Sequence, residues 1–392
     1  MSTTTAPQAE LSRPIVAGVV TALVGFTSSF AVVLAGLRAV GANDAQAASG
    51  LLALTLSFGL GILLLSWRSK LPITLAWSTP GAALLVSTGA VDGGWPAAVG
   101  AFLAVGVLVV LTGLIPALGR LIGKIPVALA QAMLAGVLLS LCLAPFKALG
   151  STPLLVIPII VTWLLMMKFA ARWAVPVALL VALVVIGVQL LVSGSTLSSA
   201  QLVPTLVWTT PGFSWQAMAG IALPLFIVTM ASQNVPGVAV LKSFGFDTPW
   251  RASMLVTGAG TVLGAPFGGH AINLAALSAA LAAGEEAGRD PRRRWIAAFS
   301  SGWIYLLLAA LSAALVTLVA AAPAGLLEAV AGLALLSTLA SSISAALSEP
   351  SERIGAVVTF LMAASGLSFL GIGAAFWALL AGLLVRWLLR RR

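Results

Sequence analysis

Charged residues are scarce in this chain. Asp, Glu, Lys and Arg make up 8% of the 392 residues, whereas ordinary soluble domains carry roughly 25%. Hydrophobic residues make up 60%, and the mean hydropathy is +1.13. So little charge cannot cover a water-exposed surface. The composition therefore indicates an integral membrane protein with no separate soluble domain.

Reactive side chains are equally rare. The single cysteine, Cys142, excludes a disulfide framework and a multi-cysteine metal site, and its apolar surroundings predict a packing role. The motifs H-E-x-x-H, G-x-S-x-G and C-x-x-C are absent, and all ten acidic residues fall in the tail, in loops or at the ends of apolar segments. We therefore expect no enzyme, no metal and no cofactor.

Long apolar segments recur along the whole chain and predict membrane-spanning helices. A first set of seven lies at about 14–40, 45–67, 79–91, 95–118, 125–146, 152–171 and 173–193. A second set of seven lies at about 215–241, 248–265, 269–283, 294–321, 324–347, 350–366 and 371–389. We predict an all-α polytopic protein with a tail at 1–13, a first repeat at 14–193, a linker at 194–214 and a second repeat at 215–389.

The basic residues test this count. With a cytoplasmic N-terminus, only Arg38 and Lys147 of the 20 Lys and Arg residues fall on the outer side. The positive-inside rule asks for such a division. We therefore predict both termini in the cytoplasm, a linker outside it, and no role for the net charge of +10 in binding nucleic acid.

Seven spans per set is an odd number, so the second set must lie upside down relative to the first, as an inverted repeat. Similar starts of the first and eighth spans agree with this: Ala17-Gly18 and Ala219-Gly220. In this register the third span corresponds to the tenth. Both are interrupted, by Ser78-Thr79-Pro80-Gly81-Ala82-Ala83 and by Ala265-Pro266-Phe267-Gly268-Gly269-His270-Ala271-Ile272-Asn273.

Spans three and ten are also too short, at about 13 to 15 residues and 1.5 Å per residue, to cross a hydrocarbon core of roughly 30 Å. We predict half-helices preceded by extended backbone at 71–77 and at 261–267. Their N-termini would meet near the middle of the membrane and suit an anion, with Thr79 as the N-cap or as a hydroxyl donor and with Pro80, Gly81, Gly268 and Gly269 shaping the site. Ordinary Pro/Gly kinks are the alternative.

His270 is the only histidine and falls at membrane depth in the second break. An ionisable group there is a candidate for proton coupling, although a buried packing histidine is the alternative. Asn273 would share its helix face. Gln233 and Asn234 form a polar turn that contacts substrate or joins helices, and Phe30 and Phe267 supply an aromatic wall or pack in the core.

These breaks, with the segment Gln233-Asn234-Val235-Pro236-Gly237, resemble the BenE family of benzoate/proton symporters along essentially the whole chain. More distantly the pattern is similar to the inverted-repeat fold of nucleobase/cation symporters and sulfate-type anion transporters. That resemblance implies a core domain (14–118 and 215–321) that moves against a gate domain (125–193 and 324–389). Relatives with this fold often pair through the gate domain, so a homodimer is one alternative.

The resemblance implies import of benzoate, or a close aromatic carboxylate, with a proton across a bacterial inner membrane. The nucleobase branch carries carboxylates in its eighth and tenth spans, where this chain offers Gln233 or Asn234 and His270 or Asn273. A nucleobase symporter is therefore one alternative. A proton-independent anion exchanger or channel that uses the same site is another.

Overall fold

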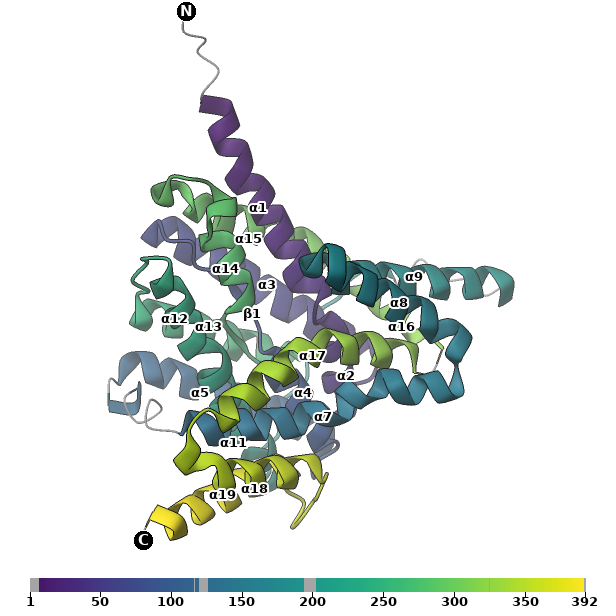
Figure 1. Ribbon diagram of the computed structural model, residues 1–392, viewed down its shortest axis with the longest axis vertical. Helices are drawn as coiled ribbons and strands as arrows, with labels where there is room; N and C mark the ends of the chain where they lie inside the picture. The colour runs from purple at the N-terminus through teal and green to yellow at the C-terminus, as the bar shows by residue number, and fades with distance from the viewer. Residues whose placement is uncertain (1–6, 116, 120–125, 194–201, 324, 391–392) are drawn as a thin grey trace, which may run out of the picture.

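The computed structural model describes residues 7–115, 117–119, 126–193, 202–323 and 325–390, and helices dominate it (Figure 1). The first half contains α1 (Pro7–Thr27), α2 (Phe30–Ala39), α3 (Asp44–Ser69), α4 (Thr79–Thr88), α5 (Gly94–Leu114), α7 (Val127–Ser151), α8 (Pro153–Phe169), the 3₁₀ turn η1 (Ala171–Trp173) and α9 (Ala174–Ser193). In Figure 1, α7, α8, α9 and α17 run side by side across the molecule.

The second half is more interrupted. One helical stretch is built from α10 (Trp215–Ala217), the π turn η3 (Met218–Ala222), α11 (Leu223–Thr229), the π turn η4 (Met230–Asn234) and α12 (Val235–Ser243). It is followed by α13 (Trp250–Gly264), the 3₁₀ turn η5 (Ala265–Phe267), α14 (Leu277–Ala283), the 3₁₀ turns η6 (Glu285–Ala287) and η7 (Pro291–Arg293), α15 (Trp295–Ala310) and α16 (Ser312–Ala320). The chain then forms α17 (Leu326–Leu347), the 3₁₀ turn η8 (Pro350–Glu352), α18 (Arg353–Ala364) and α19 (Ala374–Arg390).

Among the described residues, seven helical stretches are long and apolar enough to cross a membrane. An eighth would be the pair Pro291–Ala310 and Ser312–Ala320, which is bent by 51°. The chain is therefore a multi-pass membrane protein, as its composition predicts. Helix is found in each of the fourteen predicted intervals, but the number that cross the bilayer stays a prediction.

Two short strands lie at the centre of the helices. β1 (Leu75–Trp77) pairs antiparallel with β2 (Ile272–Leu274), so that Ala76 lies opposite Asn273. A bridge of this kind satisfies backbone N–H and C=O groups that no helix would satisfy at membrane depth. It joins the segment before α4 to the segment before α14.

Helices of the two halves pack on each other reciprocally: α3 on α15, and α5 on α13. Glycines allow the close approach. A Cβ on Gly106 of α5 would lie 2.7 Å from the Val262 nitrogen, and one on Gly258 of α13 would lie 2.6 Å from the Val110 nitrogen. Gly302 and Gly59 face each other in the same way between α15 and α3. Small residues at such crossings are how apolar helices gain contact inside a membrane.

The predicted extended backbone and helix start of the second break are wrong by about two helical turns. α13 continues through Thr261 to Gly264, and the extended backbone follows Gly268, because Gly268 adopts φ +92° and ends the helix. The Gly269 N–H donates to the Gly264 carbonyl (2.9 Å) and the Gly268 N–H to the Ala265 carbonyl (2.8 Å), which is the hydrogen-bond pattern of a Schellman cap. The helix predicted from Gly269 begins at Leu277 instead.

Candidate functional site

The first break ends in a capped helix N-terminus. Ser78, not Thr79 as predicted, is the N-cap of α4: its Oγ accepts a hydrogen bond from the Gly81 N–H (3.2 Å) and also bonds the Thr229 hydroxyl (2.8 Å). Thr79 and Pro80 are the first two helical residues, where the missing N–H of proline costs no helical bond. The Thr79 side chain is half-buried, and no hydrogen bond of its hydroxyl is found among the described residues. That hydroxyl is therefore available to a ligand.

His270 lies behind this helix start. Its ring is fully buried, with Nε2 3.1 Å from the Ser78 carbonyl oxygen and with the Phe102 ring edge-on at 6.2 Å. Because a carbonyl only accepts, Nε2 carries the hydrogen. Nδ1 has no hydrogen-bond partner in the described part of the chain. The histidine thus touches the cap of α4 and not the open space in front of it.

The sequence predicts that Asn273 shares a helix face with His270. In the structure Asn273 belongs to β2 instead, because residues 272–274 pair with β1. Its amide lies between the Leu274 carbonyl and the Ser78 N–H. The orientation that satisfies both donates Nδ2 to Leu274 (2.8 Å) and accepts from Ser78 (3.1 Å). Asn273 therefore secures the strand pair and the cap of α4.

Gln233 and Asn234 point to different places from the π turn η4. Asn234 is fully buried, and its Oδ1 accepts from the Leu274 N–H (2.8 Å), so it fastens β2 to the eighth predicted span. Gln233 is half-buried and lines a cavity. A π turn shifts the helical register by one residue, and such turns are frequent at functional sites.

The cavity has a volume of about 90 Å³, closer to a monocyclic ligand than to the drug-sized pockets of about 300–1,000 Å³. Segments that surround the strand pair, and one helix of the predicted gate domain, line it: Gly25, Ser28, Ser29, Ala76, Trp77, Thr79, Pro80, Gln233, Ala275, Ala276, Ser278, Ala334, Leu335 and Thr338. Among the described residues, the lining contains hydroxyl and amide groups but no Asp, Glu, Lys, Arg or His. Ligand charge would meet only neutral dipoles there.

The cavity brings together Thr79, Pro80 and Gln233 of the predicted site residues. The other predicted residues are not among those that line it. Phe30 is fully buried against Phe26, with ring centroids 5.9 Å apart, and Phe267 lies edge-on to Trp208 at 5.4 Å. A Cβ on Gly268 would meet Trp95 at 3.0 Å, so protein and not ligand approaches that glycine.

Gly81 and Gly269 also contact protein. A Cβ on Gly81 would come within 2.7 Å of the Ser78 Oγ, and one on Gly269 within 3.1 Å of the Gly264 carbonyl. Both glycines allow the backbone to pack closely beside the cavity. Neither lines it.

Sequence reasoning missed several lining residues. Ser28 and Ser29 separate α1 from α2 inside an apolar run, and Trp77 immediately precedes the first break. The Trp77 Nε1 donates to the Ser29 Oγ (2.7 Å), which ties the α1–α2 break to β1. The break between α1 and α2 is a third interruption of a predicted span. The pair of serines within the first apolar segment was its signal in the sequence. Ser278 and Thr338 carried no comparable signal.

The linker supports the second break from outside. The Thr209 N–H donates to the Pro266 carbonyl (2.7 Å), and the Trp95 Nε1 donates to the Thr209 hydroxyl (3.0 Å). Ser49 of α3 donates to the Phe267 carbonyl (2.8 Å) and accepts from the Val207 N–H (2.8 Å). The described linker residues 202–213 thus hold residues 265–267 in place.

Interrupted helices around a small, partly polar cavity, within an apolar helical bundle, define a membrane transporter. The fold is similar to that of the transmembrane domain of the cyanobacterial bicarbonate transporter BicA, which superposes with a TM-score of 0.58 at 16% identity, over 98% of both chains. A family model described as "Benzoate membrane transport protein" (BenE) matches residues 8–388. The chain therefore belongs to the BenE family, which confirms the resemblance inferred from the break motifs.

Two curated relatives match nearly the whole chain. "Inner membrane protein YdcO" of Escherichia coli (strain K12) is 39% identical over 368 residues, which cover 94% of this chain and 93% of that protein. "Benzoate membrane transport protein" of Acinetobacter baylyi is 29% identical over 382 residues, with 95% and 94% covered. The protein is a transporter and not an enzyme, as the missing catalytic motifs predict.

Proposed function

We propose that the protein imports benzoate, or a close aromatic carboxylate, together with a proton by alternating access. The cavity carries the proposal, because it combines the start of α4 with the Gln233 amide and with apolar surface. The family description, and the name of the Acinetobacter baylyi relative, favour the same class of substrate.

The carboxylate would bind at the α4 end of the cavity. A helix N-terminus carries a partial charge of about +0.5, and the Thr79 hydroxyl and the Gln233 amide are donors beside it. The ring would lie against Trp77 and Leu335, where an aromatic face and an aliphatic side chain form the apolar part of the lining. In the part of the chain that the structure describes, no carboxylate lines the cavity to repel the substrate.

We propose His270 as the proton-coupling residue, acting through the cap of α4. Its Nε2 hydrogen bond to the Ser78 carbonyl joins the imidazole to the residue that precedes Thr79. An anion bound in front of Thr79 would favour a second proton at Nδ1, and the proton would favour the anion in return. One proton moving with one monoanion carries no net charge, so the pH gradient would supply about 1.4 kcal/mol per unit.

The proposed architecture has fourteen spans, two inverted repeats, and separate core and gate domains. Three observations support it: helix in every predicted interval, the reciprocal packing of α3 on α15 and of α5 on α13, and the strand pair between the two breaks. The cavity lies where residues of α17 from the proposed gate domain face the proposed core domain. Pairing of two copies through the gate domain is compatible with this division.

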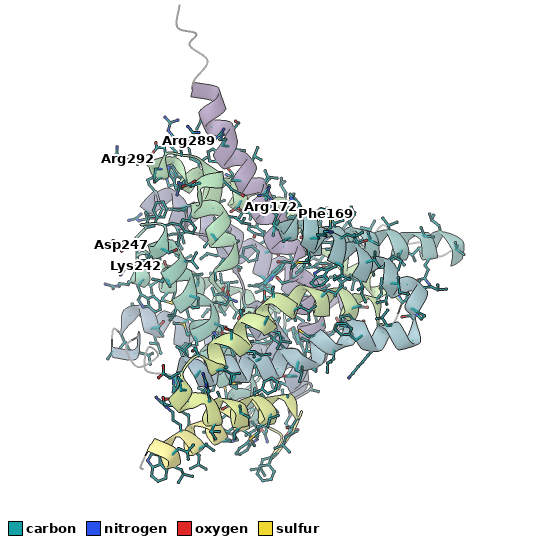
Figure 2. All side chains as sticks on the ribbon, viewed as in Figure 1. Phe169, Arg172, Lys242, Asp247, Arg289 and Arg292 are labelled. Carbon is teal, nitrogen blue, oxygen red and sulfur yellow. The ribbon has the colours of Figure 1, made fainter. Side chains whose placement is uncertain are left out.

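The orientation of the chain is part of the proposal. We place both termini in the cytoplasm and residues 194–214 outside it. Figure 2 shows Lys242, Arg289 and Arg292 along the same side of the molecule, to which the positive-inside rule assigns the cytoplasm.

Uptake of labelled benzoate into proteoliposomes tests the proposal. We expect accumulation only when the outside is more acidic, and no response to an imposed membrane potential. His270→Gln should abolish the acceleration by the pH gradient and still bind benzoate. Equilibration without accumulation would establish a channel. Dependence on an anion inside the vesicle would establish an exchanger, and competition by uracil would favour the nucleobase alternative.

A further inference from the structure

An apolar groove lies on the outside of the helical bundle, between α7, α17 and α18. It has a volume of about 290 Å³ and is lined only by aliphatic and aromatic side chains. Its floor is made of alanines that are almost fully buried, including Ala132, Ala135 and Ala356. Larger side chains, Val357 and Leu361, stand at its edge with 42% and 59% of their surfaces exposed.

The alanines leave this space open. In α7 and α18 a longer side chain at these positions would fill the groove from within, but here the helices offer only methyl groups. In a bilayer such a groove does not stay empty, because an unfilled apolar surface forfeits the dispersion contacts of its lining atoms. A hydrocarbon chain fits its chemistry.

One end of the groove carries a positively charged group. Arg353, the first residue of α18, is exposed and lies one turn before Ala356 and Val357. Its Nε donates to the carbonyl of Leu347, itself a lining residue, at 3.0 Å. That bond fixes the guanidinium at the mouth of the groove with its two Nη groups free, since no other partner of Arg353 is found in the described part of the chain.

The other charges at this corner do not neutralise Arg353 directly. Glu352 is paired with Arg386 of α19, with Nε and Oε1 2.8 Å apart. Glu349 is exposed, and its carboxylate hydrogen-bonds the Ser351 hydroxyl at 3.5 Å. The α17–α18 corner lies beside α19, which leads to the C-terminus (Figure 1).

We propose that this groove is a binding site for an anionic phospholipid, with one acyl chain between α7, α17 and α18 and the phosphate on the Arg353 guanidinium. Arginine suits a phosphate because its planar donors can bind two oxygens at once. The apolar groove explains why a lipid, and not a free anion, is the ligand. The site is separate from the substrate cavity, since the two share no lining residue.

Native mass spectrometry of the full-length protein tests the proposal, with phosphatidylglycerol and phosphatidylcholine of identical acyl chains as probes. We expect the wild type to retain one phosphatidylglycerol per protomer more tightly than phosphatidylcholine. This preference should be about fivefold, which corresponds to the roughly 1 kcal/mol that a basic residue contributes at an anionic membrane surface. Arg353→Gln should remove it. Arg289→Gln, which removes an exposed charge elsewhere (Figure 2), is the matched control and should change nothing.

A second variant tests the groove itself. Ala346→Phe should fill it and remove the retained lipid of either headgroup, without altering the elution volume of the protein. Equal lipid retention by the wild type and by Arg353→Gln would overturn the proposal. So would conversion of a dimer to a monomer by Ala346→Phe with lipid retention unchanged, because the groove would then hold a second copy of the chain.

Discussion

The two breaks at the centre of the molecule differ more than an inverted repeat suggests. The first passes from β1 through a single capping residue, Ser78, directly into α4. The second needs nine residues, 268–276, to pass from a capped helix end through β2 to α14. Thr79 and Pro80 of the first break face the cavity, whereas His270 and Asn273 of the second are buried behind it.

This difference divides the work between the repeats. The first break presents a helix start to the cavity. The second supports that start from behind, because His270 contacts the Ser78 carbonyl and Asn273 pairs with Ala76. Apart from the proposed proton coupling at His270, changes in the second break should therefore act first on stability, and changes in the first break on transport.

The largest effect is expected from Gly268→Ala. Gly268 has φ +92°, and an added Cβ would lie 3.0 Å from the Trp95 ring and 3.1 Å from the Gly50 Cα. The left-handed conformation costs an alanine roughly 1–2 kcal/mol, and overpacking about 1–3 kcal/mol more. We expect a lower thermal unfolding midpoint in detergent, followed by fluorescence, and loss of folded protein at growth temperature.

Gly150→Ala is the matched control, since no described residue outside its own stretch of helix lies within 4 Å of its added Cβ and its φ is not positive. Alanine is the better helix former by roughly 1 kcal/mol, so this variant should be as stable as the wild type or more so. Equal stability of the Gly268 and Gly150 variants would show that the second break is not rigidly packed.

The polar turn offers a sharper test of the division between structural support and the cavity, because two adjacent residues fall on opposite sides of that division. Asn234 supports β2, whereas Gln233 lines the cavity. Asn234→Ala leaves the buried Leu274 N–H without its acceptor, at a cost of about 1–3 kcal/mol. Gln233→Ala removes a cavity residue with no buried partner. We expect the first to lower the unfolding midpoint, and the second to raise the KM for benzoate uptake with the midpoint unchanged.

If Asn234→Ala raised KM and left the midpoint unchanged, the assignment of the two side chains would be reversed. Asn234→Asp is a useful addition, because its carboxylate oxygen can still accept from Leu274. Partial recovery of stability in that variant would identify the acceptor as the missing group.

The apolar helices and the existence of the two breaks could be predicted from the sequence because they depend on local properties: hydropathy, proline and glycine. The helix start at Thr79 was within one residue of its cap. The second break was misplaced because its course depends on pairing with β1, about 200 residues away in the chain, and no local pattern records such a partner.

Which residues line the cavity was harder to predict than where the cavity lies. His270 and Asn273 are polar residues at membrane depth, and composition alone cannot say whether such groups face a ligand or satisfy buried backbone. Ser278 and Thr338 reach the cavity only through the packing of α14 and α17 against the first break. The glycines were assigned to ligand approach for the same reason, although protein atoms occupy the space beside them.

The smallest effect on stability is expected at Thr79, and it tests the first break alone. Thr79→Val keeps the shape of the side chain and removes its hydroxyl, for which no hydrogen bond is found among the described residues. Stability should therefore change little, while a bound carboxylate would lose one donor. A hydrogen bond to a charged group contributes about 1.5–3 kcal/mol, so KM for benzoate should rise at least tenfold. Thr79→Ser retains the hydroxyl and should stay close to the wild type, and an unchanged KM in Thr79→Val would mean that the hydroxyl does not contact the substrate.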